Sequence, residues 1–190
     1  MNKQTNRKTC PVWLGYGLNA SMRKIIHNPK KIVGKYIKPR MTVADIGTGM
    51  GYMTLPMAKM VGSQGKVVGV DIQEGMLGKV MRIAKQKRLN HRIEPVLCQQ
   101  TSLMLDRYEN EIDFALMFMM VHEVDNKQKL FVDINQALKP KGLLMIAEPK
   151  IHVSKKNFTE TVDIALKAGF KVSGIKQKVN ICRTIILEKD

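Results

Sequence analysis

The sequence predicts an α/β fold in which a mostly parallel sheet carries helices on both faces. From Thr42 onward, short apolar runs typical of strands alternate with segments whose apolar residues recur at helical spacing. Most strand-like runs are apolar throughout, as expected for parallel strands that are covered on both sides. At 190 residues, the chain has the length of one such domain.

The elements of the first half follow from local signals. Asn28 and Pro29 supply an N-cap and a first helical residue, and Gly62 is placed to end the helix after the first strand. Pro95 cannot donate a ladder hydrogen bond, so its strand is expected at a sheet edge. We expect helices at 29–38, 53–61 and 74–89 and strands at 43–46, 65–71 and 93–98.

The second half continues the alternation. The run from Asp113 to Met120 is apolar after its first residue, and Gly169 ends the last helical pattern. The short connection between the final two strands implies an antiparallel pair. We expect strands at 113–120, 142–147, 171–178 and 183–188 and helices at 126–138 and 159–168.

Composition excludes several classes of protein. No apolar stretch approaches the length of a membrane-spanning helix and no signal-peptide core follows the N-terminus, so we expect a soluble, cytoplasmic protein. Cys10, Cys98 and Cys182 are far apart and odd in number, which suggests neither a disulfide framework nor a zinc site.

The strongest compositional signal is a formal net charge of +16, from 32 basic and 16 acidic residues. Residues 1–44 contain no acid at all. Such a field attracts RNA, anionic head groups or acidic metabolites, but a solvated lysine-rich surface explains it equally well. We interpret residues 1–41 as a basic tail and helical lid segment, followed by a ligand-binding domain at 42–190.

The chain is organised around a glycine loop. Gly47, Gly49 and Gly51 follow a buried strand at every second position and precede a helix, an arrangement that lets a ligand approach the backbone and the helix N-terminus. Asp71 ends the next strand, twenty residues beyond Gly51, where its carboxylate can accept ribose hydroxyls. The pattern therefore predicts a cofactor that contains a nucleoside.

Two such cofactors fit, a nicotinamide dinucleotide and S-adenosylmethionine. The dinucleotide fingerprint is Gly-x-Gly-x-x-Gly, whereas the glycines here are spaced Gly-x-Gly-x-Gly. The chain also lacks a substrate domain and a Tyr-x-x-x-Lys pair for proton transfer. The spacing thus disfavours a nicotinamide dinucleotide.

The segment from Val43 to Tyr52 resembles the first motif of class I S-adenosylmethionine-dependent methyltransferases, and Gly69 to Ile72 resembles the second. Residues 113–124 are similar to the fourth-strand segment, and 138–142 to the Leu-Lys-Pro-Gly-Gly turn, with Lys141 in place of its first glycine. The resemblance covers residues 42–190. It implies a Rossmann-like, seven-stranded, mostly parallel sheet of order 3-2-1-4-5-7-6, with the last strand antiparallel.

The resemblance also implies where S-adenosylmethionine binds. Asp45 and the loop would border the methionine part, Asp71 the ribose and Ile72 the adenine. Gln99 stands where many members have an Asp that accepts from the adenine amino group. The cofactor-binding residues expected on this basis are Asp45, Gly47, Thr48, Gly49, Gly51, Tyr52, Asp71, Ile72, Gln99, Gln100, Phe118 and Met119.

The expected activity is in-line methyl transfer to a small or anionic acceptor. His122, just past the fourth strand, is the candidate base or orienting donor, and Glu123 and Glu148 are candidates for binding a cationic or hydroxyl substrate. No Asn/Asp-Pro-Pro-Tyr, Pro-Cys or metal-binding carboxylate pattern is present. Two alternatives stay open, an rRNA or tRNA methyltransferase that uses the basic surface and a cofactor- or RNA-binding protein without catalysis.

Overall fold

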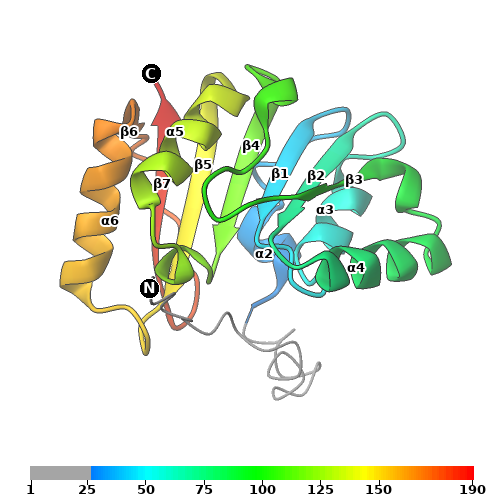
Figure 1. The fold of residues 1–190 in the computed structure, drawn as a ribbon, viewed down its shortest axis with the longest axis horizontal. Coiled ribbons are helices and arrows are strands. Elements are labelled where there is room, and N and C mark those ends of the chain that lie inside the picture. The colour runs from blue at the N-terminus through cyan, green and yellow to red at the C-terminus, as the bar shows by residue number, and fades with distance from the viewer. Residues whose placement is uncertain (1–26) are drawn as a thin grey trace, which may run out of the picture.

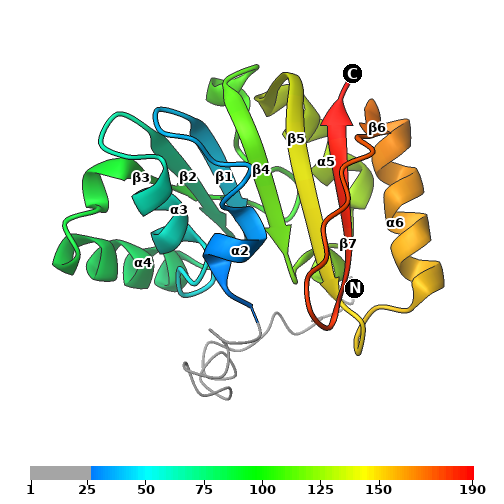
Figure 2. The same cartoon turned by 180° about the vertical axis from the view of Figure 1, so that it is seen from behind.

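The computed structural model describes residues 27–190, which form a seven-stranded sheet between two layers of helices (Figures 1 and 2). The strand order is β3-β2-β1-β4-β5-β7-β6, which confirms the expected order. Strand β7 runs antiparallel to β5 and β6, and the other pairings are parallel. The strands span β1 Thr42–Ile46, β2 Lys66–Asp71, β3 Ile93–Leu97, β4 Ile112–Phe118, β5 Leu138–Pro149, β6 Phe170–Val172 and β7 Cys182–Lys189.

The helices divide between the two faces of the sheet. Those of the first half, α2, α3 and α4, share one hydrophobic core with one face of the sheet, and α5 and α6 share a second core with the other face. The α-helices span α2 Pro29–Val33, α3 Thr54–Met60, α4 Glu74–Gln86, α5 Lys127–Ala137 and α6 Lys155–Lys167, and short 3-10 turns are η2 Asn90–Arg92, η3 Asp106–Tyr108 and η4 Val121–Glu123.

Strand β4 shows how one apolar run serves both cores. Phe114 and Leu116 point into the core beneath α2, α3 and α4, whereas Ala115 and Met117 point into the core beneath α5 and α6. All four side chains are at most 1% exposed. Since successive side chains of a strand face opposite sides, a central strand must be apolar at every position, as the sequence predicted.

Some predicted boundaries were wrong. Helix α2 ends at Val33 and not at residue 38, because Gly34 and the turn after it interrupt the helix. Tyr36 and Ile37 are nevertheless buried, as expected. Helix α6 begins at Lys155, four residues earlier than predicted, because the Ser154 side chain accepts a hydrogen bond from the Asn157 amide and caps it. Strand β6 spans Phe170–Val172 and shares only two residues with the strand predicted at 171–178.

Other local predictions agree with the structure. Strand β3, which contains Pro95, lies at one edge of the sheet. Within residues 27–190, no helix combines the length and the apolar character that crossing a bilayer requires. Residues 1–26, which include most of the expected lid segment, lie outside the described part of the chain, so the lid stays a prediction.

Candidate active site

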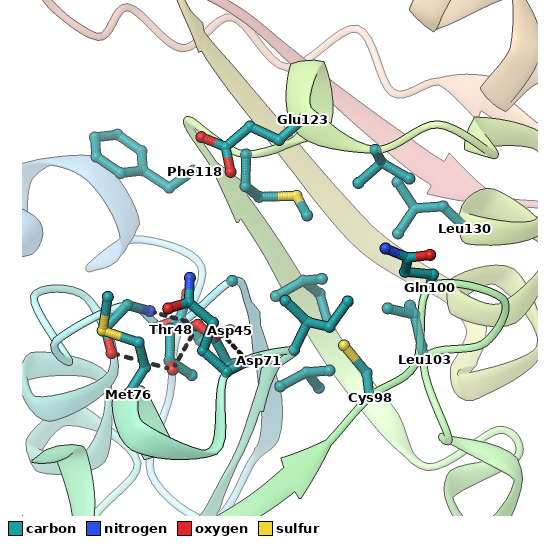
Figure 3. A pocket seen from close by; sticks show the side chains of 18 of the residues that line it. Asp45, Thr48, Asp71, Met76, Cys98, Gln100, Leu103, Phe118, Glu123 and Leu130 are labelled. Carbon is teal, nitrogen blue, oxygen red and sulfur yellow. Dashed lines mark hydrogen bonds between the residues drawn. The ribbon is translucent and has the colours of Figure 1, made fainter. Parts of the chain in front are cut away.

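One cavity lies beyond the carboxyl ends of β1, β2 and β4, where the sequence placed the ligand. Its volume is about 590 Å³, within the range of small-molecule sites. The glycine loop and Asp71 form one side, and the residues from Phe118 through η4 into α5 form another (Figure 3). A single cavity therefore joins the predicted cofactor residues to the candidate base, His122.

The carboxylate of Asp71 holds the glycine loop in place. Its Oδ2 accepts hydrogen bonds from the Gly49 amide at 2.8 Å and from the Thr48 hydroxyl at 3.3 Å, and its Oδ1 accepts one from the Gln73 amide at 2.9 Å. Gly47 and Gly49 have φ angles of 79° and 51°, a region in which glycine is favoured. Each carboxylate oxygen can accept more than one hydrogen bond, so Asp71 can hold the loop and still meet a ligand hydroxyl.

Gly51 differs from the other predicted cofactor residues because it does not line the cavity. It has a φ of 81°, and a Cβ at this position would lie 3.2 Å from Val80 Cγ2 and 3.3 Å from Leu55 Cγ. The absence of a side chain thus lets α3 pack closely against α4. Gly51 thus has a packing role, and its contact with the cofactor stays a prediction.

Asp45 is buried at the end of β1 and is 1% exposed. Burial raises the pKa of its carboxyl group to about 7; the hydrogen bond from the Thr54 hydroxyl opposes this rise, and the charge of Asp71 adds to it. The Thr54 hydroxyl lies 2.6 Å from Asp45 Oδ2. A buried carboxyl group with this pKa would be stabilised in its charged form by a cationic ligand.

The sequence analysis did not identify Thr54 as part of the site. It is fully buried at the first position of α3. The available signal was a threonine within reach of the last residues of β1. Whether its side chain points toward Asp45, however, depends on how α3 packs.

The structure brings the other predicted cofactor residues together. Tyr52 lies at the cavity and its hydroxyl donates to the carbonyl oxygen of His27 at 2.6 Å, so the start of the described chain is adjacent to the site. Burial raises the pKa of the neighbouring Cys98 thiol to about 11, which leaves it protonated at neutral pH. The predicted residues that line the cavity are Asp45, Gly47, Thr48, Gly49, Tyr52, Asp71, Ile72, Gln99, Gln100, Phe118 and Met119.

His122 lies on η4, and Glu148 at the end of β5 holds it there. The Glu148 carboxylate accepts hydrogen bonds from the backbone amides of Val121 and His122 at 3.1 and 3.0 Å. It also lies 2.7 Å from His122 Nδ1. This hydrogen bond raises the pKa of the His122 imidazole, and partial burial of the ring opposes the rise.

This geometry corrects the expectation for Glu148. Its side chain is 2% exposed, does not line the cavity and contacts the η4 turn, so it does not bind an acceptor directly. Glu123, in contrast, lines the cavity, and in the view of Figure 3 it lies across from Asp45 and Asp71. The sequence could not separate the two glutamates because both follow the ends of neighbouring strands.

The wall of the cavity is acidic although the chain as a whole is strongly basic. Among the charged residues between 27 and 190 that line it, Lys129 is the only lysine or arginine, and its ammonium group pairs with Asp133. An anionic ligand would meet repulsion from these carboxylates, whereas a neutral or cationic ligand would not. The acidic residues at the cavity are Asp45, Asp71, Glu123, Asp125 and Asp133.

Comparisons with known proteins agree with this site. A family model described as a methyltransferase domain matches residues 37–182. The crystal structure of a SAM dependent methyltransferase from Aquifex aeolicus is 25% identical and superposes with a TM-score of 0.81, covering 95% of this chain and 99% of that chain.

Two curated relatives are similar over part of their length. The ubiquinone/menaquinone biosynthesis C-methyltransferase UbiE of Hydrogenovibrio crunogenus is 30% identical over 59% of this chain and 43% of that protein. The demethylmenaquinone methyltransferase of Desulfitobacterium hafniense is 27% identical over 70% of this chain and 49% of that protein. The matched region therefore spans less than half of either relative.

Proposed function

Because the chain belongs to the methyltransferase domain family, within the class I S-adenosylmethionine-dependent methyltransferases, we propose that it transfers a methyl group from S-adenosylmethionine to a small neutral or cationic acceptor. The observation that carries this proposal is the single cavity that joins Asp45, Asp71 and the glycine loop to His122 and Glu123. Cofactor-binding and acceptor-facing residues thus share one enclosed space.

The residues at the loop fit this cofactor. When bound, S-adenosylmethionine supplies an electrophilic methyl group on a positively charged sulfur, and it also carries an ammonium group. Asp45 provides a buried carboxylate whose ionisation a neighbouring cation favours. Asp71 provides an acceptor for ribose hydroxyls at the end of β2.

His122 is the residue that we assign to proton removal from the acceptor. When Nδ1 donates its hydrogen to Glu148, the lone pair of the neutral imidazole is on Nε2. The buried carboxylate also stabilises the imidazolium that forms when Nε2 takes a proton. Glu148 therefore acts through His122, as a positioning residue.

The acidic wall supports a neutral or cationic acceptor more than the anionic one that the net charge suggested. Glu123 is placed to attract an amine or to accept a hydrogen bond from a hydroxyl group. The relatives' names indicate different acceptors, among them quinone precursors and ribosomal protein L11. The residues that line the cavity are therefore a better guide to the acceptor class of this chain than the name of any one relative.

Two measurements test the proposal. Calorimetry with S-adenosylmethionine is expected to show binding that Asp71→Ala weakens by about 10- to 100-fold, since hydrogen bonds to a charged group are worth about 1.5–3 kcal/mol. In the second measurement, the protein is incubated with radiolabelled cofactor and either a metabolite extract or RNA. We expect the label in low-mass products of the extract, and His122→Gln should reduce that labelling. Absence of cofactor binding to the wild type would reject the assignment, and label found in RNA alone would reject the small acceptor.

A further inference from the structure

The net charge of the chain comes almost entirely from its first half. Residues 1–92 contain 18 of the 32 basic residues and 3 of the 16 acidic ones, whereas residues 93–190 contain 14 basic and 13 acidic residues. The basic residues are divided almost evenly, so the asymmetry arises from the scarcity of acids in the first half. The excess of positive charge is therefore a property of particular elements.

Within the described residues, this excess lies on α2, α3 and α4, on the segments next to these helices, and at the start of β2. Of the three acids in residues 27–92, Asp45 and Asp71 are buried at the cavity, which leaves Glu74 as the only exposed one. Exposed basic side chains in the same range are Lys30, Lys31, Lys35, Lys38, Arg40, Lys59, Lys66, Arg82, Lys85, Lys87 and Arg88.

Helix α4 carries a stripe of like charges. The exposed side chains of Arg82 and Lys85 are three residues apart, so they lie on one side of the helix and repel each other. Helix α6, in the opposite layer, instead has Lys156 four residues before Glu160 and Lys167 four residues after Asp163, a spacing that balances charge. The contrast shows that α4 retains a repulsion that a polyanion would relieve.

The basic residues of neighbouring elements continue this surface. Helix α3 contacts both α2 and α4, and Figure 2 shows α2 and α3 in front of the sheet with α4 beside them. Arg92, on η2 after α4, donates from Nη1 to the Ala58 carbonyl oxygen at 3.4 Å, next to Lys59. We call this surface of α2, α3, α4 and η2 the basic face.

We propose that the basic face binds nucleic acid through its phosphate backbone. The alternating lysines and arginines suit phosphate, and arginine can bind it with two hydrogen bonds. None of the large exposed apolar side chains of the described residues lies on α2, α3 or α4, so this face lacks the groups that insert into a membrane. These helices also contain no aromatic residue, which predicts binding without base stacking or sequence preference.

The basic face begins at the cavity. Gln73, the N-cap of α4, and Met76 in its first turn both line the cavity, and the helix extends from there by about 20 Å, at 1.5 Å per residue. Nucleic acid bound along α4 would thus lie beside the cavity mouth. Binding needs no methyl transfer, so this proposal does not depend on the proposed function.

The test compares two variants of the full chain that lose the same charge. Arg82→Gln/Lys85→Gln/Lys87→Gln neutralises three cations of the basic face, and Lys155→Gln/Lys156→Gln/Lys167→Gln neutralises three exposed cations of α6. Fluorescence anisotropy with a labelled 20-nucleotide single-stranded RNA of mixed sequence, between 50 and 300 mM salt, measures affinity and its salt dependence. Calorimetry with S-adenosylmethionine checks that each variant keeps its folded cavity.

We expect the wild type to bind the RNA and the α4 variant to bind at least tenfold more weakly at 100 mM salt. The slope of log affinity against log salt should decrease by about 2, since each lost phosphate contact removes about 0.7. The α6 variant should change less than threefold. Equal losses of RNA affinity in both variants, or no RNA binding by the wild type, would overturn the proposal, whatever the cofactor measurement shows. It would also be overturned if the α4 variant lost affinity for vesicles of anionic phospholipid and kept its affinity for RNA.

Discussion

Replacing Asp45 by Asn is expected to stabilise the protein without ligand, and by an amount that increases with pH. The carboxyl group is buried, and its pKa is raised from 3.8 to about 7. In the unfolded chain it ionises near its ordinary pKa, so between these two values the folded state holds about one proton more than the unfolded state. By linkage, the contribution of Asp45 to stability is fully present below pH 3.8 and is lost as the pH rises through 7.

The magnitude follows from the same pKa values. Between pH 5 and pH 8, the wild type loses about 2–3 kcal/mol through this group, because one-proton linkage over about two pH units contributes roughly 1.4 kcal/mol per unit. The Asn side chain does not titrate, so the gap in unfolding free energy between variant and wild type should widen by that amount. For a chain of this size, the gap corresponds to about 5–10 °C in Tm.

Thermal unfolding at pH 5 and pH 8, followed by circular dichroism, measures the gap directly. Asp163→Asn, which removes an exposed carboxylate on α6, is the matched control and should show no such widening. A gap between wild type and Asp45→Asn that is equal at the two pH values would refute the inference that the folded protein resists ionisation of Asp45. The same variant should bind S-adenosylmethionine more weakly, since it cannot offer a carboxylate to a cation.

Three further predictions concern other contacts. Glu148→Gln should lower the pKa of His122, which an NMR titration of the imidazole measures. It should also move the rising limb of the rate of methyl transfer to lower pH and reduce the maximal rate. An unchanged titration would contradict the pairing of His122 with Glu148. Gly51→Ala should destabilise the fold by about 1–3 kcal/mol in urea unfolding, through strain at positive φ and contact with Val80, and should leave m unchanged. Phe131→Ala should cost about 3–5 kcal/mol in the same assay because its ring is fully buried, and a loss below 1 kcal/mol would show that the core beneath α5 collapses around the cavity.

The features that could be predicted from the sequence are those set by local pattern. The apolar run of β4, the glycine loop and Asp71 at the end of β2 each appear within a few residues of sequence, and the resemblance to class I methyltransferases supplied the strand order. The cap that starts α6 was also local, since Ser154 directly precedes the helix.

The features that could not be predicted depend on contacts between distant segments. Glu148 differs from Glu123 only because the carboxyl end of β5 lies beneath the turn that follows β4. The packing role of Gly51 requires knowing that Val80 of α4 approaches α3. The raised pKa of Asp45 depends on how completely the surrounding side chains exclude water, which no spacing of residues records.

The attachment of η4 to Glu148 has a consequence for how this domain can change over generations. Because a buried group on the sheet fixes the backbone at Val121 and His122, that anchor does not rely on the side chains that face the acceptor. Met120 and Glu123, which line the cavity, can then be exchanged one at a time while the imidazole keeps its place. We therefore expect the wall of this cavity to tolerate gradual substitution while the anchored turn stays in place.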